Sequence, residues 1–546
     1  MKLKTLAKVG SVTLVTALGL AACGSSNSSS ESGSTKTLTW QESANLPTLD
    51  PSKATDNVSM RTLNNSNEGL LMVGNDNKVQ PGVAKSYSVS KDGKTYTFNL
   101  RKSKWSDGSE LTAKDFVYGI QRTANPKTAS QYSYLLDHVK NYEAVSKKQM
   151  PVSSLGVKAE GNYKLVITLS KPQSYFKYIV AMSPLYPQSE KAVKKYGSAY
   201  GTKSADQVYN GPYKVTGWTG TNDSWTLTRN KDYYNNSKTK LDKVKFTVSK
   251  DAGTTLNQYQ AGKFDVATLS GKQQVNNFKN SPQLHDLKQS SMWYLEMNQK
   301  SNPVLKNENI RKAISLAIDR KALTKDVLGD GSTPAKGLVP TGLASHDGKD
   351  FADAAEDSNE TTNDVSYNLA EAKKYWAKGL KEVGKKSVSL GLLADDTPTA
   401  TKNTEAIQSD LTKLPGLKIT NQNLPFKTRL TNSQNGKFDL VLSGWNGDYP
   451  DPITFLDLFT SDNAYNNGHW KNAEYDKYVS DAEGKDANNA GKRWDDLVNA
   501  EKVLMDNAGI VPLYQPVLSQ VRKDNVKGLE YSTTGPGFNF RDTYIK

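Results

Sequence analysis

A single cysteine, Cys23, stands at the end of an uncharged apolar stretch near the start of this 546-residue chain. A lone cysteine excludes any disulfide within the chain, so the fold has to be held by a hydrophobic core and hydrogen bonds. The apolar residues 9–22 follow three lysines. This stretch is too short to cross a bilayer comfortably, and the pattern is typical of an export signal. We therefore expect a folded body that begins after this segment.

The residues around Cys23 predict what happens to the segment before it. Residues 20–24 read LAACG, which resembles the lipobox of bacterial lipoproteins. The resemblance implies a lipoprotein signal peptide over residues 1–22 and a lipid on Cys23. Residues 24–34 hold seven Ser and two Gly, a composition typical of a flexible chain, so residues 23–34 are interpreted as a tether. We expect a protein anchored by its lipid on the extracytoplasmic face of the cell membrane of a Gram-positive bacterium.

Charge and motifs exclude several function classes. The 71 Lys and Arg exceed the 56 Asp and Glu by 15, but they are scattered, and no zinc finger or RNP-like stretch accompanies them, so we expect no nucleic acid partner. The four histidines stand far apart, and there is no H-E-x-x-H or EF-hand loop, so no metal is expected. The phosphate-binding glycine patterns are missing as well, and no cofactor is predicted.

The residue pattern of the body predicts a mixed α/β fold. Apolar and polar residues alternate on both sides of an Asp-Gly turn, and this pattern predicts a β-hairpin over residues 86–100. Thr112 and Asp115 form a capping box that predicts a helix through Thr123. Further strands are expected at 163–169 and 225–228, and further helices at 309–323, behind Asn368 and at 494–504. Residues 342–363 are predicted to be a long exposed loop.

One enzyme class has partial sequence support. Penicillin-binding enzymes use S-x-x-K, S-D-N and K-T-G. Ser88 and Lys91 match the first motif and residues 461–463 match the second, but K-T-G is missing. Ser88 also falls in the predicted hairpin, whereas the nucleophilic serine should open a helix. The adjacent acids Asp395 and Asp396 are interpreted as surface charge. We therefore expect a binding protein and not an enzyme.

Eight stretches stand out in order along the chain: residues 49–51 (LDP), 83–101 (VAKSYSVSKDGKTYTFNLR), 105–108 (WSDG), 111–118 (LTAKDFVY), 210–215 (NGPYKV), 229–234 (RNKDYY), 310–320 (IRKAISLAIDR) and 444–452 (GWNGDYPDP). Together they resemble the extracellular solute-binding protein family 5. The similarity runs from about residue 38 to the end. This family comprises the peptide- and nickel-binding proteins of ABC importers.

The resemblance implies an α/β architecture of two lobes, like the periplasmic binding proteins of class II, with an additional domain inserted in the first lobe. We expect domain I, a discontinuous lobe, at 35–73, 205–298 and 510–546. Domain II is expected at 74–204, and domain III, the second lobe, at 299–509. Hinge closure around a ligand lets a permease distinguish the loaded protein from the empty one.

The resemblance also implies a function and a site. Residues 447–449 are similar to the oligopeptide-binding branch, in which Asp448 receives the α-ammonium group of the peptide. The expected partners are therefore oligopeptides, the permease subunits and ATPases of a peptide ABC transporter, and the membrane through Cys23. The remaining ligand-binding predictions are backbone contacts from Gly444 and Asn446, a peptide-pairing strand at Thr55, Asp56 and Asn57, and side-chain pockets lined by Trp293, Tyr294, Trp445 and Phe426.

Alternatives remain open at this point. The ligand could be a dipeptide, a peptide pheromone or a nickel complex, although dispersed histidines give nickel little support. A wall-attached adhesin with a basic surface is another class. The predicted aromatic contacts could pack in the core instead, and Asp448 could merely cap the helix suggested by residues 453–459. Where some members fix the peptide carboxylate with arginine, this chain offers Ser433 and Leu442, with Arg429 upstream.

Overall fold

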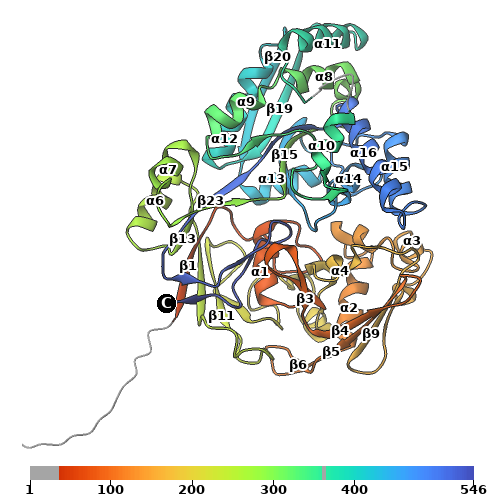
Figure 1. The fold of residues 1–546 in the computed structure, drawn as a ribbon, viewed down its shortest axis with the longest axis vertical. Helices are drawn as coiled ribbons and strands as arrows, with labels where there is room; N and C mark the ends of the chain where they lie inside the picture. Colours follow the sequence, from red (N-terminus) through yellow and green to blue (C-terminus); the bar gives the residue numbers. More distant parts are fainter. Residues whose placement is uncertain (1–35, 359–364) are drawn as a thin grey trace, which may run out of the picture. The chain divides into compact units, whose positions relative to one another are not determined.

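The computed structural model describes residues 36–358 and 365–546, and most of its strands lie in three sheets (Figure 1). The predicted signal peptide, the lipid site at Cys23 and the tether lie outside the described residues. In the described part of the chain, no helix is long and apolar enough to cross a membrane.

The first lobe is built on a seven-stranded sheet with the order β10-β11-β12-β1-β13-β23-β14. Its strands are β1 (Thr37–Glu42), β10 (Tyr213–Thr216), β11 (Ser224–Arg229), β12 (Lys243–Val248), β13 (Val266–Thr268), β14 (Leu284–Lys288) and β23 (Val517–Arg522). The central strand β1 runs parallel to β12 and β13. One core cluster forms around Trp40, Trp225 and Phe246, and the last two rings stack at 5.1 Å.

The second lobe is built on a six-stranded sheet with the order β16-β22-β15-β21-β19-β20. Its strands are β15 (Ser291–Met297), β16 (Thr333–Pro334), β19 (Val388–Asp395), β20 (Leu417–Leu424), β21 (Leu440–Asn446) and β22 (Val511–Gln515). Helices α8 (Glu308–Ala317), α11 (Leu369–Glu382) and α12 (Pro398–Leu411) pack with it in a second core cluster. Helices α8 and α11 are at the top of Figure 1, and α12 lies lower on the left.

A four-stranded antiparallel sheet, β4-β5-β9-β8, forms the inserted domain. It contains β4 (Ala84–Val89), β5 (Thr95–Leu100), β8 (Val157–Ala159) and β9 (Lys164–Thr168). The predicted hairpin is confirmed as β4 and β5. The predicted capping box is also confirmed, because Thr112 and Asp115 together cap α2 (Ala113–Ala124). The chain enters this domain after the first-lobe strand β1 and returns to the first-lobe sheet at β10.

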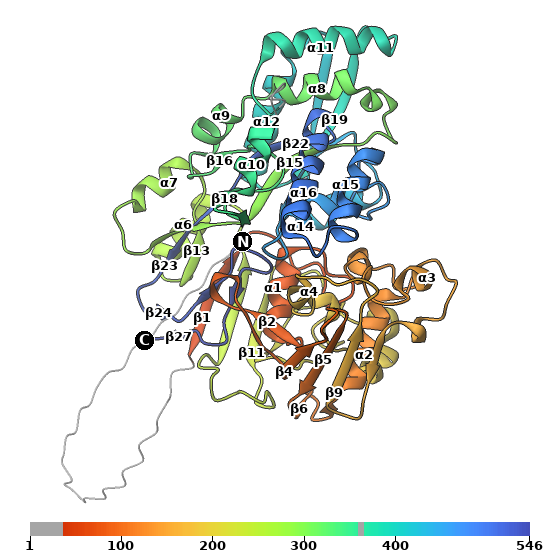
Figure 2. The same ribbon diagram turned by 45° about the vertical axis from the view of Figure 1, so that its right-hand side comes forward.

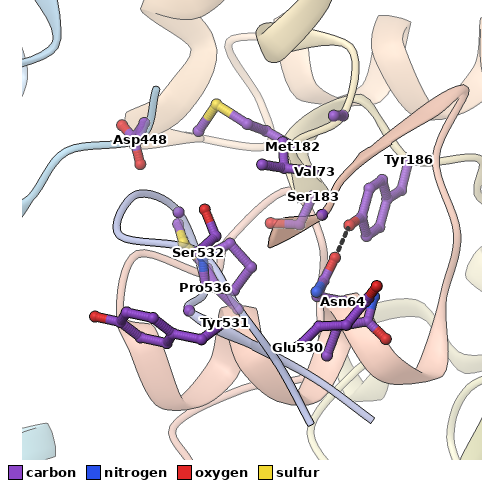
Figure 3. Close-up of a pocket in the computed structure, with 16 residues that line it drawn as sticks. Asn64, Val73, Met182, Ser183, Tyr186, Asp448, Glu530, Tyr531, Ser532 and Pro536 are labelled. Carbon is purple, nitrogen blue, oxygen red and sulfur yellow. Dashed lines mark hydrogen bonds between the residues drawn. The ribbon is translucent and has the colours of Figure 1, made fainter. Parts of the chain in front are cut away.

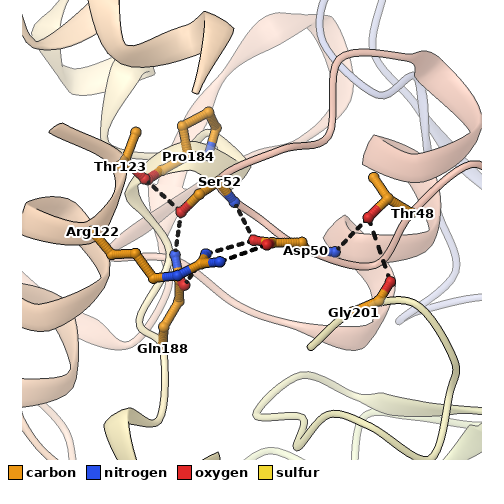
Figure 4. A network of polar contacts seen from close by, with 8 residues as sticks. All are labelled: Thr48, Asp50, Ser52, Arg122, Thr123, Pro184, Gln188 and Gly201. Carbon is orange, nitrogen blue, oxygen red and sulfur yellow. Dashed lines mark hydrogen bonds and ion pairs between the residues drawn. The ribbon is translucent and has the colours of Figure 1, made fainter. Parts of the chain in front are cut away.

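A buried polar network ties the inserted domain to the first lobe (Figure 4). Arg122 of α2 donates to both carboxylate oxygens of Asp50, each at 2.6 Å, and also to Gln188 at 2.9 Å. Ser52 and Thr123 share a hydrogen bond at 2.8 Å. Bidentate pairing of this kind fixes geometry as well as charge.

The remaining elements connect and cover these sheets. The α-helices are α1 (Asn57–Ser66), α3 (Tyr142–Ser146), α4 (Phe176–Ile179), α5 (Glu190–Tyr196), α6 (Ala252–Gln260), α7 (Gly271–Phe278), α9 (Arg320–Ala322), α10 (Phe351–Ser358), α13 (Phe426–Gln434), α14 (Ile453–Leu456), α15 (Ala473–Glu483) and α16 (Ala490–Asp506). Short strand pairs are β2 (Leu71–Val73) with β3 (Val79–Pro81), β6 (Ser103–Lys104) with β7 (Glu110–Leu111), β17 (Ser345–His346) with β18 (Lys349–Asp350), β24 (Val526–Lys527) with β27 (Tyr544–Ile545), and β25 (Glu530–Tyr531) with β26 (Phe538–Asn539).

Two predictions about local structure were wrong. The helix expected at 309–323 is interrupted, because α8 ends at Ala317 and the side chain of Asp319 accepts from the backbone N–H of Ala322 to begin α9. The loop expected at 342–363 contains β17, β18 and α10. Helix α10 forms because Phe351 is buried and packs edge-on against Trp494 at 5.1 Å. The helices expected behind Asn368 and at 494–504 are confirmed as α11 and α16.

The chain passes between the two large sheets at only two places in its described part, residues 289–290 and Pro516. These two short segments are candidates for the hinge between the lobes, because hinge motion is usually absorbed by a few residues that connect packed units. The predicted two-lobed α/β fold class with an inserted domain is therefore confirmed. The exact domain boundaries stay a prediction. Two strands differ from the predicted allocation: β15 and β22, expected in domain I, pair within the six-stranded sheet.

Candidate functional site

Asp448 follows β21 and is buried where the lobes meet, with 5% of its surface exposed. The hydroxyl of Tyr132, from the inserted domain, donates to its Oδ1 at 3.2 Å. Its Oδ2 is buried and has no hydrogen-bond partner among the described residues. Burial raises the pKa of Asp448 to about 8, and the bond from Tyr132 lowers it only partly. The site therefore holds a desolvated carboxyl with one unused oxygen.

Asp448 does not cap a helix. The backbone N–H of Asp448 donates to the hydroxyl of Thr454 at 3.0 Å, and Pro452 occupies the N-cap position of α14. The carboxylate that serves the first turn is Asp451, which accepts from the N–H of Ile453 at 3.1 Å. The alternative of a purely structural cap is therefore excluded for the Asp448 side chain.

A small pocket of about 30 Å³, partly open to solvent, adjoins Asp448 (Figure 3). Its walls come from α1, from the segment 181–186 of the inserted domain and from the C-terminal segment 530–539. Its lining includes Met60, Met182, Tyr186, Glu530 and Tyr531. Most of the lining surface is apolar, and Asp448 is one of the few charged groups in it.

Aromatic rings surround Asp448. Tyr465 lies 5.4 Å from Tyr132 and 4.7 Å from Trp445, both in edge-on contact. The indole Nε1 of Trp445 is buried without a hydrogen-bond partner among the described residues. Buried polar atoms are paired in nearly all native structures. However, Nε1 of Trp105, Trp218 and Trp225 in the cores also lacks a partner among the described residues, so this indole does not by itself mark a ligand site.

Asp56, a predicted ligand contact, is a buried carboxylate of the first lobe, with 7% exposed, and does not line the pocket of Figure 3. Its Oδ1 accepts from the N–H of Ser59 at 2.8 Å and caps α1. The backbone of Asp56 is extended, with φ −131° and ψ 154°, and Asn57 is already the first residue of α1. Pairing of this segment with a peptide stays a prediction. Thr55 is half-buried and Asn57 is exposed.

The predicted backbone contacts lie on β21. This strand pairs with β15 along its whole length, whereas its pairing with β19 covers only Leu440 and Val441. Beyond Val441 no described strand lies along that second edge of β21, which includes Gly444 and Asn446. The Asn446 side chain accepts from Ser291 at 2.7 Å and donates to the carbonyl of Gly535 at 2.6 Å. Free backbone groups at a strand edge can bind an extended peptide.

The other aromatic residues that were predicted to contact the ligand pack against neighbouring side chains. Tyr294 is buried against Phe459 at 5.6 Å, and Trp293 stacks on Tyr514 at 6.2 Å. The ring of Phe426, the first residue of α13, lies under the guanidinium of Arg429 at 5.1 Å. Neither these three aromatics nor Trp445 lines the pocket of Figure 3. Their role in ligand contact stays a prediction.

Arg429 is not a free cation. Its guanidinium forms an ion pair with Asp395 at 2.8 Å, and both side chains are largely buried. Asp396 pairs with Lys250 of the first lobe at 2.9 Å. The interpretation of Asp395 and Asp396 as plain surface charge was therefore wrong. Both carboxylates have specific cationic partners, one of them across the lobes.

Contacts between the lobes bury this site. Tyr175 of the inserted domain stacks on Tyr449 at 4.9 Å and donates to Glu483 at 2.6 Å. Gln434 of α13 donates to Gln131 at 2.7 Å. In Figures 1 and 2, α14 to α16 of the second lobe face the inserted domain. One hydrophobic cluster includes residues from both sides.

Sequence reasoning missed Tyr132, Tyr465 and the segment 530–539. Tyr132 is 316 positions from Asp448, and no local pattern marks it as a site residue. The segment 530–539 contains Gly535, Pro536 and Gly537, which predict a turn but not a pocket wall. By contrast, the alternative nucleophile Ser88 lies exposed in β4 and does not open a helix.

The comparisons with known proteins cover nearly the whole chain. The family described as bacterial extracellular solute-binding proteins, family 5, matches residues 78–467. The dipeptide-binding protein of Lactococcus lactis subsp. cremoris is 36% identical over 565 residues, which cover all of both chains. A structure of Listeria monocytogenes OppA bound to peptide has 38% identity and a TM-score of 0.89, and covers 94% of this chain and 99% of that one.

Two structures of one relative bear on lobe closure. The Escherichia coli murein tripeptide-binding protein MppA, 28% identical, matches with a TM-score of 0.85 and covers 94% of this chain and 99% of its own. Its unliganded open form matches with a TM-score of only 0.61, over 94% of this chain and 98% of its own. The lobes of the present structure are therefore not arranged as in that open form.

Proposed function

This chain belongs to family 5 of the bacterial extracellular solute-binding proteins, and we propose on that premise that it captures oligopeptides by lobe closure and delivers them to an ABC permease. The observation that carries the proposal is the unused Oδ2 of Asp448, which is buried between the lobes. A buried carboxylate without a partner is costly. The α-ammonium group of a peptide supplies the missing charge-assisted hydrogen bonds.

The free edge of β21 supports an extended peptide as the ligand. A peptide backbone carries alternating donors and acceptors, so it can add to a strand edge independently of its sequence. The segment that includes Gly444 and Asn446 offers such an edge. Because Arg429 is already paired with Asp395, the proposal does not assign it to the peptide carboxylate and leaves the length of the peptide open. Dipeptides and longer peptides are both within its scope.

Calorimetry with a tripeptide and its N-acetylated form tests the proposed function. The free-amine peptide is expected to bind in a 1:1 ratio, and the acetylated peptide, which lacks the ammonium charge, is expected to bind poorly. Mass spectrometry should show that the bound peptide is released unchanged. Equal affinities for the two peptides would contradict the role of Asp448. Covalent labelling by a fluorescent β-lactam, lost in Ser88→Ala, would instead support the acyl enzyme.

We also propose that the protein is lipid-anchored on the extracytoplasmic face of the membrane, from the LAACG sequence at Cys23. Cys23→Ala should release the protein into the medium or leave it unprocessed, because the lipid is the proposed anchor and stable anchoring depends on acyl chains. Fractionation of cells that express the wild type and the variant measures this. A variant with unchanged membrane retention and unchanged electrophoretic mobility would contradict the anchor.

A further inference from the structure

The C-terminal segment 532–535 is bonded to the loop that carries Asp448. The backbone N–H of Gly535 donates to the carbonyl of Gly447 at 2.7 Å, and the carbonyl of Gly535 accepts from the side chain of Asn446 at 2.6 Å. These two partners are the residues that directly precede Asp448. Gly535 and Asp448 also line the same pocket. The position of Gly535 therefore helps to fix the position of the Asp448 carboxylate.

Asn77, in the turn between β2 and β3, holds the same segment with four hydrogen bonds. Its Oδ1 accepts from the hydroxyl of Ser532, from the hydroxyl of Thr534 at 2.9 Å and from the backbone N–H of Thr534 at 3.3 Å. Its Nδ2 donates to the hydroxyl of Thr533 at 2.9 Å. One side chain thus binds the three consecutive residues that lead into Gly535.

The β2–β3 turn itself does not require the side chain of Asn77. This residue has a φ of +57°, a left-handed conformation that glycine adopts without steric cost. A glycine would therefore form the same turn. What the amide group adds is the attachment of residues 532–534 to the turn.

The segment is attached to the hinge candidate at residues 289–290 as well. Ser290 donates its backbone N–H to the carbonyl of Thr533 and its hydroxyl to the hydroxyl of Thr533, both at 3.0 Å. The carbonyl of Ser290 in turn accepts from the N–H of Gly447 at 2.7 Å. The hydroxyl of Thr533 therefore contacts both Asn77 and the hinge candidate. A shift of the segment would disturb the hinge candidate and the Asp448 loop together.

We infer that Asn77 is a positioning residue for ligand binding, which acts through the segment 532–535 to hold Asp448 where its carboxylate meets the α-ammonium group of the peptide. The inference rests on the proposed function, because it takes Asp448 as the receptor of that group. Asn77 does not line the pocket beside Asp448, so it acts from outside the ligand contact. A charge-assisted hydrogen bond depends on its geometry. Release of the segment should therefore weaken recognition of the ammonium group in particular.

Asn77→Gly tests the inference, because glycine keeps the turn and removes all four bonds. Calorimetry at pH 7.5 with Ala-Ala-Ala and its N-acetylated form gives the ratio of the two affinities for each protein. In Asn77→Gly this ratio is expected to fall about 2- to 30-fold, the range for residues that modulate a site without touching its ligand. The acetylated peptide should keep its affinity. Asn77→Asp keeps the oxygen that accepts three of the bonds and should retain most of the ratio.

Two controls show whether the effect is specific. Asn141→Gly is the matched control, because Asn141 also has a left-handed backbone, with φ +67°, and its Nδ2 donates to the carbonyl of Ser154 at 2.7 Å within the inserted domain. This variant should leave the ratio unchanged. In the second control, Asn77→Gly is added to Asp448→Ala. Because Asn77 acts through Asp448, the added substitution should not change the ratio further.

The outcomes separate the inference from the proposed function. If the wild type binds both peptides equally, the role of Asp448 is wrong and the inference falls with it. If the wild type discriminates and Asn77→Gly keeps the same ratio, the inference is overturned and the proposed function stands. An equal loss of both affinities also overturns it, because Asn77 then supports only the fold. If circular dichroism shows that Asn77→Gly is unfolded, Thr534→Val removes one hydroxyl from the same contact and should lower the ratio in the same direction.

Discussion

Asp448→Ala is expected to weaken the binding of a free-amine peptide by about 30- to several-thousand-fold. This range corresponds to about 2–5 kcal/mol, the usual cost of removing one partner of a buried charge pair. The physical reason is the position of Asp448, which is 5% exposed and surrounded by aromatic rings. An ammonium group buried there without the carboxylate would lose its hydration and gain no counter-charge.

A cycle of two proteins and two peptides isolates this interaction. Calorimetry is carried out on the wild type and Asp448→Ala with a tripeptide and its N-acetylated form. The variant should discriminate little between the two peptides, because the group that reads the ammonium is gone. Asp451→Asn is a useful neighbouring control for stability, since Asp451 pairs with Arg493 at 2.8 Å rather than with the ligand site. Strong discrimination that persists in Asp448→Ala would contradict the assignment.

The raised pKa of Asp448 also predicts how peptide affinity depends on pH. In the ligand-free protein the pKa is about 8, so below pH 8 the carboxyl is mostly protonated and must lose its proton to bind an ammonium group. Affinity should therefore rise between about pH 6.5 and 7.5, by at most tenfold per pH unit. It should level off near pH 8, where the peptide amine, with a pKa of about 7.7–8.0, loses its own proton. Asp448→Asn should abolish the rise.

The raised pKa of Asp448 also determines whether the free energy of unfolding rises or falls with pH. Between the ordinary value of 3.8 and about 8, the ligand-free folded protein holds a proton that the unfolded chain has lost. The contribution of Asp448 to the free energy of unfolding therefore falls as the pH rises through this window. Saturating peptide should reverse the trend, because the bound ammonium favours the ionised carboxylate.

Asp50→Ala is expected to lower the free energy of unfolding by about 3–5 kcal/mol, the cost of breaking a buried ion pair from one side. Arg122 would keep its buried guanidinium, now without the two bonds of 2.6 Å to Asp50. Because these bonds join the first lobe to the inserted domain (Figure 4), the loss should also loosen the attachment of that domain. Urea unfolding followed by tryptophan fluorescence measures the change.

Two further variants show whether the effect is specific. The double variant Asp50→Leu with Arg122→Met removes both charges and should recover much of the lost stability, since apolar replacements of buried pairs are often neutral. Glu143→Ala removes one partner of an exposed ion pair with Lys147 and should not change the unfolding midpoint measurably. An Asp50→Ala midpoint equal to that of Glu143→Ala would show that the network contributes little.

Local signals in the sequence predicted local structure well. The Asp-Gly turn between alternating residues gave the β4–β5 hairpin, and the side chains of Thr112 and Asn368 begin α2 and α11 as expected. Helix α10 was missed because its stabilising contact, between Phe351 and Trp494, joins residues 143 positions apart. The composition of residues 342–363 is typical of a loop, but the burial of Phe351 in the tertiary structure stabilises a helix there. Contacts of this kind are not visible in a window of neighbouring residues.

The site was predictable only where the resemblance to a family reached it. The prediction of Asp448 as a site residue rested on the family-like segment 444–452, and the structure shows that this side chain is buried. The unused oxygens, the bond from Tyr132 and the neutralisation of Arg429 by Asp395 all depend on the relative placement of distant segments. The N-cap role of Asp56 was not predicted from residues 55–57, where the resemblance implied a strand and the structure begins helix α1.

The position of β23 in the first-lobe sheet has a consequence for biosynthesis. This strand lies between β13 and β14 although more than 220 residues of chain separate it from β14. At a synthesis rate of about 5–20 residues per second, β13 and β14 wait for tens of seconds before their partner leaves the ribosome. Pairings between segments so far apart also form slowly. The nascent chain therefore has a long interval in which its first lobe is incomplete and chaperones can keep it unfolded.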